Sequence, residues 1–257
     1  MKLTPIRAIP DDIPPAFRSL CEGSLLFDSS CSRIARVYFL DRDGGLFLKT
    51  APKGTLSREA EMTAYYFRKG IGAEVLGFES AEADWLLTRK ISGADCLHPA
   101  YLEDPKKLCD TLATVLRRLH ETDASDCPAS VPCPEPARLV PEYFDPSLFR
   151  SDPGFSTAEE ASDLIRRNAP LLESRTLIHG DFCLPNVMLN NWKFSGFLDV
   201  GGSGLGDRHI DLFWGLWSLG YNLHTDGFAS RFLDCYGADA VAPELLRTAA
   251  AIAAFGQ

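Results

Sequence analysis

Three polar side chains stand in a fixed order in the second half of the chain. Asp181 and Asn186 lie in the segment HGDFCLPN, and Asp199 follows in FSGFLDVGG. Transfer of a phosphoryl group from a nucleotide to a hydroxyl needs one carboxylate to orient that hydroxyl and accept its proton. An amide oxygen and a second carboxylate suit the magnesium ions that neutralise the phosphates. The order therefore predicts phosphoryl transfer, with Asp181 as the catalytic residue and Asn186 and Asp199 as metal ligands.

Two differences from protein kinases point away from a protein kinase and toward another kind of phosphotransferase. Protein kinases use H-R-D-x-x-x-x-N followed by D-F-G, whereas here Gly180 stands at the Arg and the later motif reads L-D-V-G. In these features the chain resembles the aminoglycoside phosphotransferase family, in particular the 3'-phosphotransferases, which are small-molecule relatives of protein kinases. The resemblance covers nearly the whole chain. The alternative is a surface Asp, a turn Asn and a strand-capping Asp in chance order, which explains the linked pattern poorly.

Apolar patterns divide the chain into a strand-rich first part and a helix-rich second part. Residues 32–51 contain two β-rich runs around a D-R-D-G-G turn, and residues 73–91 contain two more around an acidic turn. A helix is predicted between them over 57–71, with Ser57 as its N-cap. Further helices are predicted over 104–123, over 158–174 and after residue 206.

This order matches the fold that the resemblance implies. We expect an α+β, two-lobed protein-kinase-like fold. Its N-terminal lobe, residues 1–91, would carry a small antiparallel β-sheet and bind the nucleotide. Its larger helical lobe, residues 92–257, would hold the catalytic and acceptor sites. His179 is expected to brace the catalytic loop, and Asp211 to be a buried structural residue that hydrogen-bonds it.

The resemblance also implies a nucleotide site in the first lobe. Lys49 ends the strand LFLK, where the kinase-like fold has a lysine that contacts the α- and β-phosphates and pairs with a helix glutamate. Glu59 takes the matching position, with Glu61 as the neighbouring candidate. Phe47 lies on the same strand face as Lys49. It is expected to stack on adenine, and a place in the core is the competing interpretation.

Two further segments complete that implied site. The loop FDSSCSRIARV stands where kinases have a glycine-rich loop, and like the related phosphotransferases it lacks those glycines. Small hydroxyl residues and backbone N–H groups can still approach phosphate, so Ser32, or alternatively Ser30, is the expected contact. By register, backbone groups of Lys90 and Ile91 are expected to bind adenine at the hinge. The implied cofactors are ATP and Mg²⁺.

Composition limits the possible partners. A net charge of −9 argues against nucleic acid or an anionic membrane as a partner. No segment approaches the roughly 18 consecutive apolar residues of a membrane helix, and the N-terminus has no signal-peptide pattern. The eight cysteines include no C-x-x-C pair, so reduced thiols are expected rather than zinc or disulfides. We expect a cytoplasmic monomer or weak dimer.

The acceptor side departs from the aminoglycoside 3'-phosphotransferase pattern. Those enzymes tend to have Arg where Gly202 and Trp217 stand here, and an acidic pair that meets substrate amines where Ala253 and Ala254 stand here. The aromatic face of Trp217 is a candidate contact for a sugar ring or a cation. Three acidic residues are candidates to replace the missing pair in binding substrate amines: Asp152, Glu159 and Glu160. The simpler interpretation, a solvated start of a helix, is the better one.

The sequence thus predicts an ATP-dependent O-phosphotransferase. Its acceptor is expected to be a hydroxyl of a small molecule, first of all the 3'-hydroxyl of an aminoglycoside antibiotic, and the reaction would give resistance. Two alternatives stay open: a kinase of another small hydroxyl compound, such as a sugar, a choline-like alcohol or a different antibiotic, and a nucleotide-binding pseudoenzyme. The presence of Lys49, Asp181, Asn186 and Asp199 speaks against the pseudoenzyme.

Overall fold

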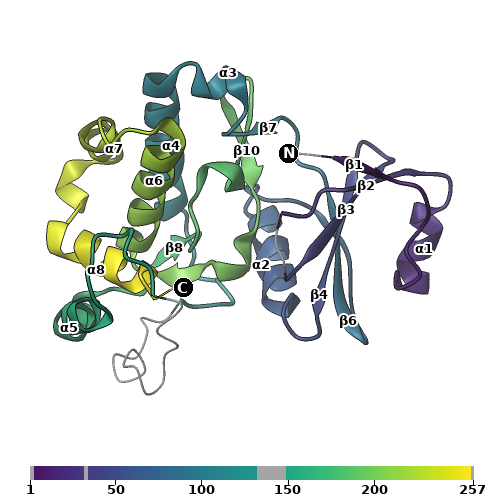
Figure 1. Cartoon of the computed structure of the whole chain (residues 1–257), viewed down its shortest axis with the longest axis horizontal. Helices are drawn as coiled ribbons and strands as arrows, with labels where there is room; N and C mark the ends of the chain where they lie inside the picture. The colour runs from purple at the N-terminus through teal and green to yellow at the C-terminus, as the bar shows by residue number, and fades with distance from the viewer. Residues whose placement is uncertain (1–2, 32–33, 132–148, 256–257) are drawn as a thin grey trace. The chain divides into compact units, whose positions relative to one another are not determined.

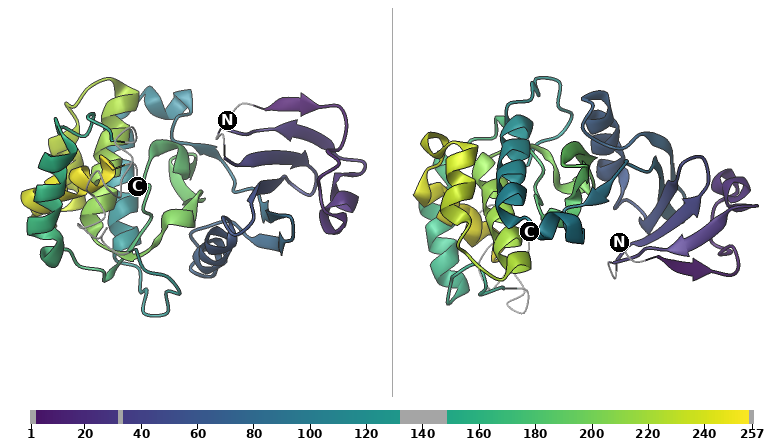
Figure 2. Two further views of the ribbon diagram at one scale, coloured as in Figure 1. Left: turned by 60° about the horizontal axis from the view of Figure 1, so that its bottom comes forward. Right: turned by 90° about the horizontal axis from the view of Figure 1, so that it is seen from above.

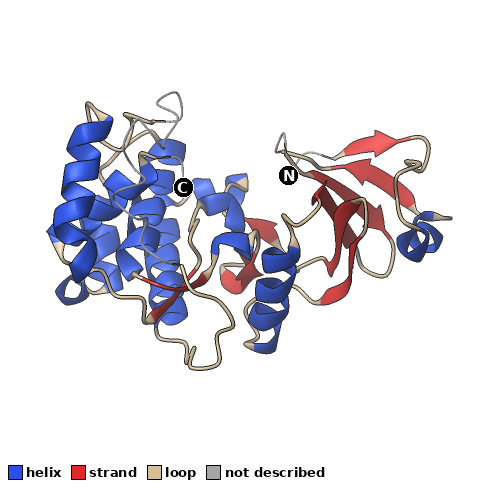
Figure 3. Cartoon of the chain, turned by 90° about the horizontal axis from the view of Figure 1, so that it is seen from below, coloured by secondary structure: helices blue, strands red, loops and turns tan. Residues whose placement is uncertain are grey.

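The structure is a computed structural model that describes residues 3–31, 34–131 and 149–255. The chain divides into two compact units, one formed by residues 1–95 with 188–201 and the other by residues 96–187 with 202–257 (Figure 1). Strands dominate the first unit and helices the second (Figure 3). The expected α+β combination of a small antiparallel sheet and a larger helical part is therefore confirmed.

The first unit contains a six-stranded sheet in which every neighbouring pair is antiparallel. The strand order is β1-β2-β3-β4-β6-β5. β-branched and aromatic residues recur along these strands and fit a pleated, half-buried surface. The strands are β1 (Thr4–Ile6), β2 (Leu25–Asp28), β3 (Arg36–Asp41), β4 (Leu46–Pro52), β5 (Val75–Ser80) and β6 (Ala83–Arg89).

The two faces of this sheet are covered by different helices. On one face, Phe17 and Cys21 of α1 (Pro15–Cys21) pack with Leu46 and Leu48 of β4 in a buried cluster. On the other face, Ala60 of α2 (Ser57–Arg68) packs with apolar residues of β4 and β6. Because side chains alternate along a strand, Phe47 and Lys49 of β4 belong to the face that carries α2.

The helix α2 begins without the predicted side-chain cap from Ser57. Ser57 is the first helical residue, and the N-cap position is held by Leu56. The carboxylate of Asp84 on β6 accepts the Leu56 N–H at 2.8 Å and the Ser80 hydroxyl at 2.6 Å. A capping acceptor from a distant strand thus replaces the local one, since the end of a helix needs an acceptor but not one from its own sequence.

A hairpin late in the sequence belongs to the first unit. β9 (Val187–Asn190) lies between β10 (Lys193–Phe197) and the short β7 (Ala94–Asp95). Asn191 and Trp192 both have positive φ, as the two central residues of a type I′ turn require, so these two residues form the turn of the hairpin. Residues of this stretch pair with β7 and with Ile71 and Gly72, and residues 188–201 belong to a unit whose main segment ends at residue 95, whereas the expected lobe boundary was 91.

The second unit is built from helices that pack pairwise. α4 (Pro105–His120) contacts α6 (Arg208–Leu223) and α7 (Ala229–Tyr236), and α8 (Pro243–Ala253) contacts α5 (Ala158–Asn168) and α6 (Figure 2). α3 (Pro99–Leu102) precedes α4, and a two-stranded sheet joins β8 (Thr176–Ile178) to β11 (Gly204–Gly206). The helix predicted over 158–174 ends earlier, at Asn168, because Pro170 lacks the N–H that would continue it.

The end of the described chain is packed into this unit. Ala254 and Phe255 belong to a buried cluster with Phe155, and the Arg150 N–H donates to the carbonyl oxygen of Ala254 at 2.8 Å. The side chains here are apolar and fill space between α5 and α8. Among the described residues, no helix combines the length and apolar character that a membrane span requires.

Candidate active site

Lys49, Glu59 and Asp199 meet in the first unit. The Lys49 Nζ lies 2.8 Å from each carboxylate oxygen of Glu59 and 2.7 Å from Asp199 Oδ1. β4 supplies the lysine, the first turn of α2 supplies the glutamate, and the segment after β10 supplies Asp199. The glutamate expected from the resemblance, rather than Glu61, is therefore the one that pairs with Lys49.

The charges in this cluster do not cancel. One ammonium faces two carboxylates, so the cluster carries a net negative charge. Burial opposes the charged form of Lys49, but the carboxylates of Asp199 and Glu59 outweigh it and raise the pKa of Lys49. Burial, together with the charge of Asp199, raises the pKa of Glu59 against the opposing effect of Lys49. A cluster of this sign favours an added cation.

The backbone around Asp199 is unusual. Asp199 has φ 52°, in the left-handed region that non-glycine residues seldom adopt. Gly201 follows closely, and a Cβ there would lie 3.3 Å from Glu59 Cβ. The Arg58 Nε–H donates to the Gly201 carbonyl oxygen at 3.1 Å. This conformation turns the chain sharply after β10 and presents the Asp199 carboxylate to Lys49.

Phe47 stands beside this cluster on the same strand face. Its ring lies 5.1 Å from that of Phe39, whose ring lies 6.0 Å from that of Phe27. Phe39 is buried, whereas Phe47 and Phe27 are only half-buried. Stacking on a flat ligand needs a ring with an exposed part. The half-exposed ring of Phe47 meets this requirement, whereas a fully buried core ring would not.

The expected hinge residues follow β6. The Lys90 N–H donates to the Gly45 carbonyl oxygen at 3.0 Å, so this donor is already engaged. Within the described ranges, no protein group donates to the carbonyl oxygen of Lys90 or accepts from the N–H of Ile91. The side chain of Ile91 packs with Ala73 and Met188. The backbone of the expected hinge thus offers one hydrogen-bond acceptor, the carbonyl oxygen of Lys90, and directly after it one donor, the N–H of Ile91.

The expected phosphate loop is only partly described. Ser32 lies outside the described residues. The alternative, Ser30, accepts the Val37 N–H on its hydroxyl at 2.9 Å, and its own N–H donates to Asp28 Oδ1 at 2.8 Å. The Ser30 hydroxyl therefore links the end of β2 to β3, and the Ser30 side chain also hydrogen-bonds the Asp28 carboxylate, which lowers the pKa of Asp28.

The loop expected to be catalytic runs from His179 to Asn186 in the second unit. The Asn186 Nδ2 donates to Asp181 Oδ2 at 2.9 Å and to the Asp181 carbonyl oxygen at 3.0 Å. The Asp181 N–H donates to His179 Nδ1 at 3.3 Å, which fits the expected bracing role of His179. The structure therefore brings Asp181 and Asn186 into direct contact.

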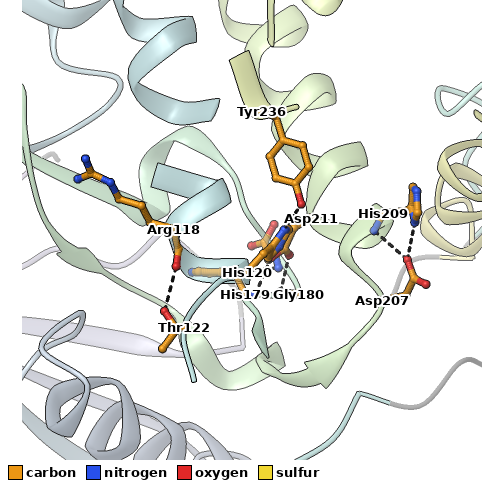
Figure 4. A network of polar contacts seen from close by, with 10 residues as sticks. Arg118, His120, Thr122, His179, Gly180, Asp207, His209, Asp211 and Tyr236 are labelled. Atoms are coloured by element: carbon orange, nitrogen blue, oxygen red, sulfur yellow. Dashed lines mark hydrogen bonds and ion pairs between the residues drawn. The ribbon is translucent and has the colours of Figure 1, made fainter. Parts of the chain in front are cut away.

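Asp211 anchors this loop from α6. Its carboxylate accepts the His179 N–H at 2.7 Å and the Gly180 N–H at 2.8 Å, and His120 Nε2 lies 3.2 Å away (Figure 4). His120 Nδ1 lies 2.7 Å from the hydroxyl of Tyr236. A buried carboxylate needs several donors to replace water, and Asp211, which is fully buried, has them. The expected structural role of Asp211 is confirmed.

Gly180 explains one departure from protein kinases. It has φ +83°, and a Cβ there would overlap the carbonyl oxygen of Gly202. No side chain fits between these two backbone segments. Gly180 therefore combines a left-handed conformation with a close backbone approach, which no other residue type tolerates at low cost.

Comparison with known families agrees with this geometry. The model of the phosphotransferase enzyme family matches residues 32–250. The chain belongs to this family. It is 42% identical over 253 residues, covering 96% of each chain, to the probable aminoglycoside 3'-phosphotransferase of Lactococcus lactis subsp. lactis. The resemblance to the aminoglycoside phosphotransferases is thereby confirmed.

Solved structures support the same membership in the phosphotransferase family. The chain is similar to an aminoglycoside-3'-phosphotransferase of type VIII, with TM-score 0.75 and 28% identity over 93% of this chain and 97% of that chain. It shares its fold with an aminoglycoside phosphotransferase of Streptomyces rimosus in complex with ADP and streptomycin. There the TM-score is 0.69 and the identity 20%, over 86% of this chain and 90% of that chain.

Trp217, expected on the acceptor side of this member of the phosphotransferase family, lies among aromatic and cationic side chains of the second unit. Trp217 stacks on Tyr221, with ring centroids 5.2 Å apart and an interplanar angle of 11°. The Arg150 guanidinium lies 5.2 Å from the centroid of the Trp217 ring. The face of Trp217 proposed for a sugar or a cation thus already contacts side chains of the chain itself.

The three acids considered as compensation have different surroundings. Asp152 accepts two hydrogen bonds from Arg150 and one from Trp217 Nε1 at 3.0 Å. Glu160 accepts the Ser156 N–H at 3.1 Å, and its own N–H donates to Thr157 Oγ1 at 3.2 Å, in the first turn of α5. Glu159 shares that turn. Glu159 and Glu160 therefore belong to a helix start, as the simpler interpretation predicted.

Asp152 also borders a cavity. The cavity has a volume of about 220 Å³ and is lined on one side by Phe213 and Trp217 of α6 and on the other by Phe228 at the start of α7. Asp152 and Asp226 are its two acidic residues. An aromatic wall with carboxylates at its edge suits an amine-bearing ring better than an anion.

Proposed function

We propose that this member of the phosphotransferase family transfers the γ-phosphate of ATP to a hydroxyl of a small molecule, foremost the 3'-hydroxyl of an aminoglycoside antibiotic, and thereby gives resistance. One observation supports this most directly: the paired Asp181 and Asn186 occur in a chain that is 42% identical to a probable aminoglycoside 3'-phosphotransferase. We place the enzyme in the cytoplasm as a monomer or weak dimer, where its free thiols stay reduced.

Asp181 would orient the acceptor hydroxyl and accept its proton late in the reaction. A carboxylate is a far weaker base than an alkoxide, so it does not remove a hydroxyl proton in advance. Because the transition state of phosphoryl transfer is loose, positioning and charge stabilisation provide most of the rate enhancement. The bond from Asn186 Nδ2 fixes one oxygen of Asp181 for this work.

Lys49 would contact the α- and β-phosphates, and Glu59 would hold Lys49 in place. Phe47 would stack on adenine, and the Lys90 carbonyl and Ile91 N–H would contact its polar edge. Ser32 keeps its proposed role at the phosphates. The half-exposed ring of Phe47 and the position of Lys49 on the same strand face support this assignment.

Mg²⁺ fits two of the oxygen donors. In the described part of the chain, no protein donor lies on Asn186 Oδ1 or on Asp199 Oδ2. No group of three His, Cys, Asp or Glu side chains within that part is arranged to hold a metal by itself, and Mg²⁺ keeps several waters and needs few protein ligands. When bound, it would neutralise the phosphate charge. Asn186 and Asp199 are therefore proposed as its ligands.

A less cationic acceptor is the second candidate. Ala253 and Ala254 are almost fully buried and provide no anion for substrate amines. A sugar, a choline-like alcohol or another antibiotic would need fewer such anions. The alternative rests on this missing acidic pair alone.

The deciding experiment measures Mg²⁺-dependent ATP turnover by the purified chain, without acceptor and with a panel of aminoglycosides, sugars and amino alcohols. We expect turnover that depends on an aminoglycoside and a product phosphorylated on its 3'-hydroxyl. The Asp181→Asn variant should bind ATP but lose turnover by about a hundredfold or more. Turnover only with the other compounds would establish the second candidate, and ATP binding without any turnover would indicate a pseudoenzyme.

A further inference from the structure

Cys183 contacts the carboxylate of Asp181 inside the catalytic loop. Its Sγ lies 3.0 Å from Asp181 Oδ1, while Asn186 Nδ2 holds Oδ2 at 2.9 Å. Each oxygen of the carboxylate therefore has one side-chain donor. The sequence places Cys183 in the loop but contains no sign of this contact, because the direction of a side chain in an irregular loop follows from backbone angles.

We propose that Cys183 is a positioning residue for phosphoryl transfer, in which its thiol fixes the carboxylate of Asp181 in the orientation that receives the acceptor proton. The inference rests on the proposed function. A carboxylate held at one oxygen still rotates, since the terminal torsion of Asp is broad. Donors at both oxygens prevent that rotation. An ionised carboxylate has about four lone-pair sites, so sites stay open for the acceptor hydroxyl.

The backbone of the loop determines where the thiol points. The Cys183 N–H donates to the Asp181 carbonyl oxygen at 2.8 Å, and the Cys183 carbonyl oxygen accepts the Asn186 N–H at 2.9 Å. The next residue, Leu184, donates its N–H to Ser218 Oγ on α6 at 3.0 Å. Phe182 and Leu184 on either side are almost fully buried. The loop thus has little freedom to turn Cys183 away from Asp181.

The thiol acts here as a neutral donor. Burial and, after it, the charge of Asp181 raise the pKa of Cys183. A thiolate is therefore disfavoured, and with it nucleophilic or metal-binding chemistry, which needs the ionised form. A protonated thiol beside a carboxylate donates a hydrogen bond, although a weaker one than a hydroxyl provides.

The competing explanation is that Cys183 merely fills space. It is 8% exposed, and small buried cysteines are common in cores. The two explanations separate when donor and volume are changed independently. Cys183→Ser keeps a donor and nearly the shape. Cys183→Val removes the donor without leaving a cavity, since it adds one methyl branch, and suits the extended backbone of φ −102° and ψ 155°.

The test compares steady-state kinetics of the wild type and these variants with Mg²⁺, ATP and the best acceptor of the panel. We expect Cys183→Val to lower kcat about tenfold, with KM for ATP and acceptor within about twofold, because positioning acts on the transition state. Cys183→Ser should restore kcat to within about threefold of the wild type. The matched control is Cys109→Ala, a fully buried thiol on α4, which should lower the melting temperature and leave kcat unchanged.

A double variant gives the decisive readout. If Cys183 acts through Asp181, then Cys183→Val introduced into Asp181→Asn should change the residual rate by less than about twofold. An equal loss in both backgrounds, or normal kcat in Cys183→Val, would overturn the inference while leaving the proposed function intact. A wild type that phosphorylates no acceptor would overturn both.

Discussion

The Lys49 ammonium and the Asp199 carboxylate, 150 residues apart in sequence, lie 2.7 Å from each other. Glu59 binds the same ammonium through both of its oxygens. Two carboxylates thus hold the lysine, and one of them, Asp199, is a proposed magnesium ligand. Nucleotide and metal would therefore bind beside a lysine whose position is fixed by two carboxylates.

Lys49→Ala should raise KM for ATP more than it lowers kcat, because a phosphate-anchoring lysine contributes mainly to ground-state binding. KM for the acceptor should change little. Steady-state kinetics with each substrate varied in turn measure both constants. The matched control, Lys106→Ala on the exposed surface of α4, should leave both unchanged. An effect confined to the acceptor would move Lys49 out of the nucleotide site.

Asp199→Asn should abolish Mg²⁺-dependent turnover and weaken the binding of MgATP. Asn is the better replacement than Ala because it tolerates the left-handed φ of 52° at this position, so the backbone turn is kept while the charge is lost. Isothermal titration with MgATP and with metal-free ATP separates the contributions. If MgATP affinity and turnover both stay at wild-type values, Asp199 is not a metal ligand.

Gly180→Ala should unfold or displace the catalytic loop. The substitution combines a left-handed φ with an overlap between the new Cβ and the Gly202 carbonyl oxygen. We expect a loss of about 2 kcal/mol or more in the free energy of unfolding, and loss of activity. Gly70→Ala is the matched control, since Gly70 has a similar φ of +74° with open space around it. Urea unfolding of both variants separates the overlap from the backbone strain, and equal losses would contradict this account.

Local patterns in the sequence predicted much of this architecture. The apolar spacing over 104–123 predicted α4, and the apolar residues that recur at helical spacing there are buried: Leu108, Leu112, Val115, Leu116 and Leu119. Asp211 was predictable as a brace because an acid in an apolar helix start needs nearby donors, and the catalytic loop provides them. The first inference depends on apolar residues at regular spacing, and the second on a single acid placed within an apolar helix start.

Contacts between distant segments were not predictable in the same way. Met188 and Leu189 pair with β7, and Asp84 caps a helix from another strand, because both partners are set by the folded backbone. Trp217 was expected to present a face, but Arg150 and Tyr221 contact it. The donor role of Cys183 likewise depends on a loop conformation that residue types alone do not determine.

Asp207→Asn should destabilise the protein in a pH-dependent way. Burial opposes the charge, but donors from His209 and the Glu173 N–H outweigh it and lower the pKa of Asp207. His209 Nε2 accepts the Ala242 N–H at 3.0 Å, so Nδ1 carries the proton that Asp207 accepts. In the Asp207→Asn variant, the amide nitrogen of the new side chain would face one of these donors, and two donors cannot form a hydrogen bond with each other.

The direction of the pH dependence follows from the lowered pKa of Asp207. The charged form of Asp207 is favoured in the folded state. Its contribution to the free energy of unfolding is therefore present above about pH 4, the ordinary pKa of an aspartate, and is lost as the pH falls through the lowered pKa of the folded state. At pH 7 we expect a loss of about 2 kcal/mol, the value of hydrogen bonds to a charged group. Urea unfolding of wild type and variant from pH 7 downward should show the difference shrinking below about pH 4. Asp163→Asn, on the exposed face of α5, should show a much smaller difference at every pH.

The last prediction concerns the range of acceptors. Each exposed ammonium–carboxylate contact contributes about 0.2 to 1 kcal/mol, and more when partly desolvated. Buried Ala253 and Ala254 provide none, and Asp152 is shared with Arg150. We therefore expect activity restricted to a few aminoglycosides, or a preference for a less cationic hydroxyl compound. Steady-state kinetics over kanamycin-like and neomycin-like acceptors measure this range.

Two variants test whether acidic residues at the cavity beside Trp217 determine the range of acceptors. Asp152→Asn and Asp226→Asn each remove one of its two acids. If the cavity receives an amine-bearing ring, each should raise KM for a cationic acceptor several-fold and leave KM for ATP unchanged. Glu159→Gln, at the exposed start of α5, is the matched control and should have no effect. Broad acceptance with low-micromolar KM, insensitive to Asp152 and Asp226, would show that other anions complete the acceptor site.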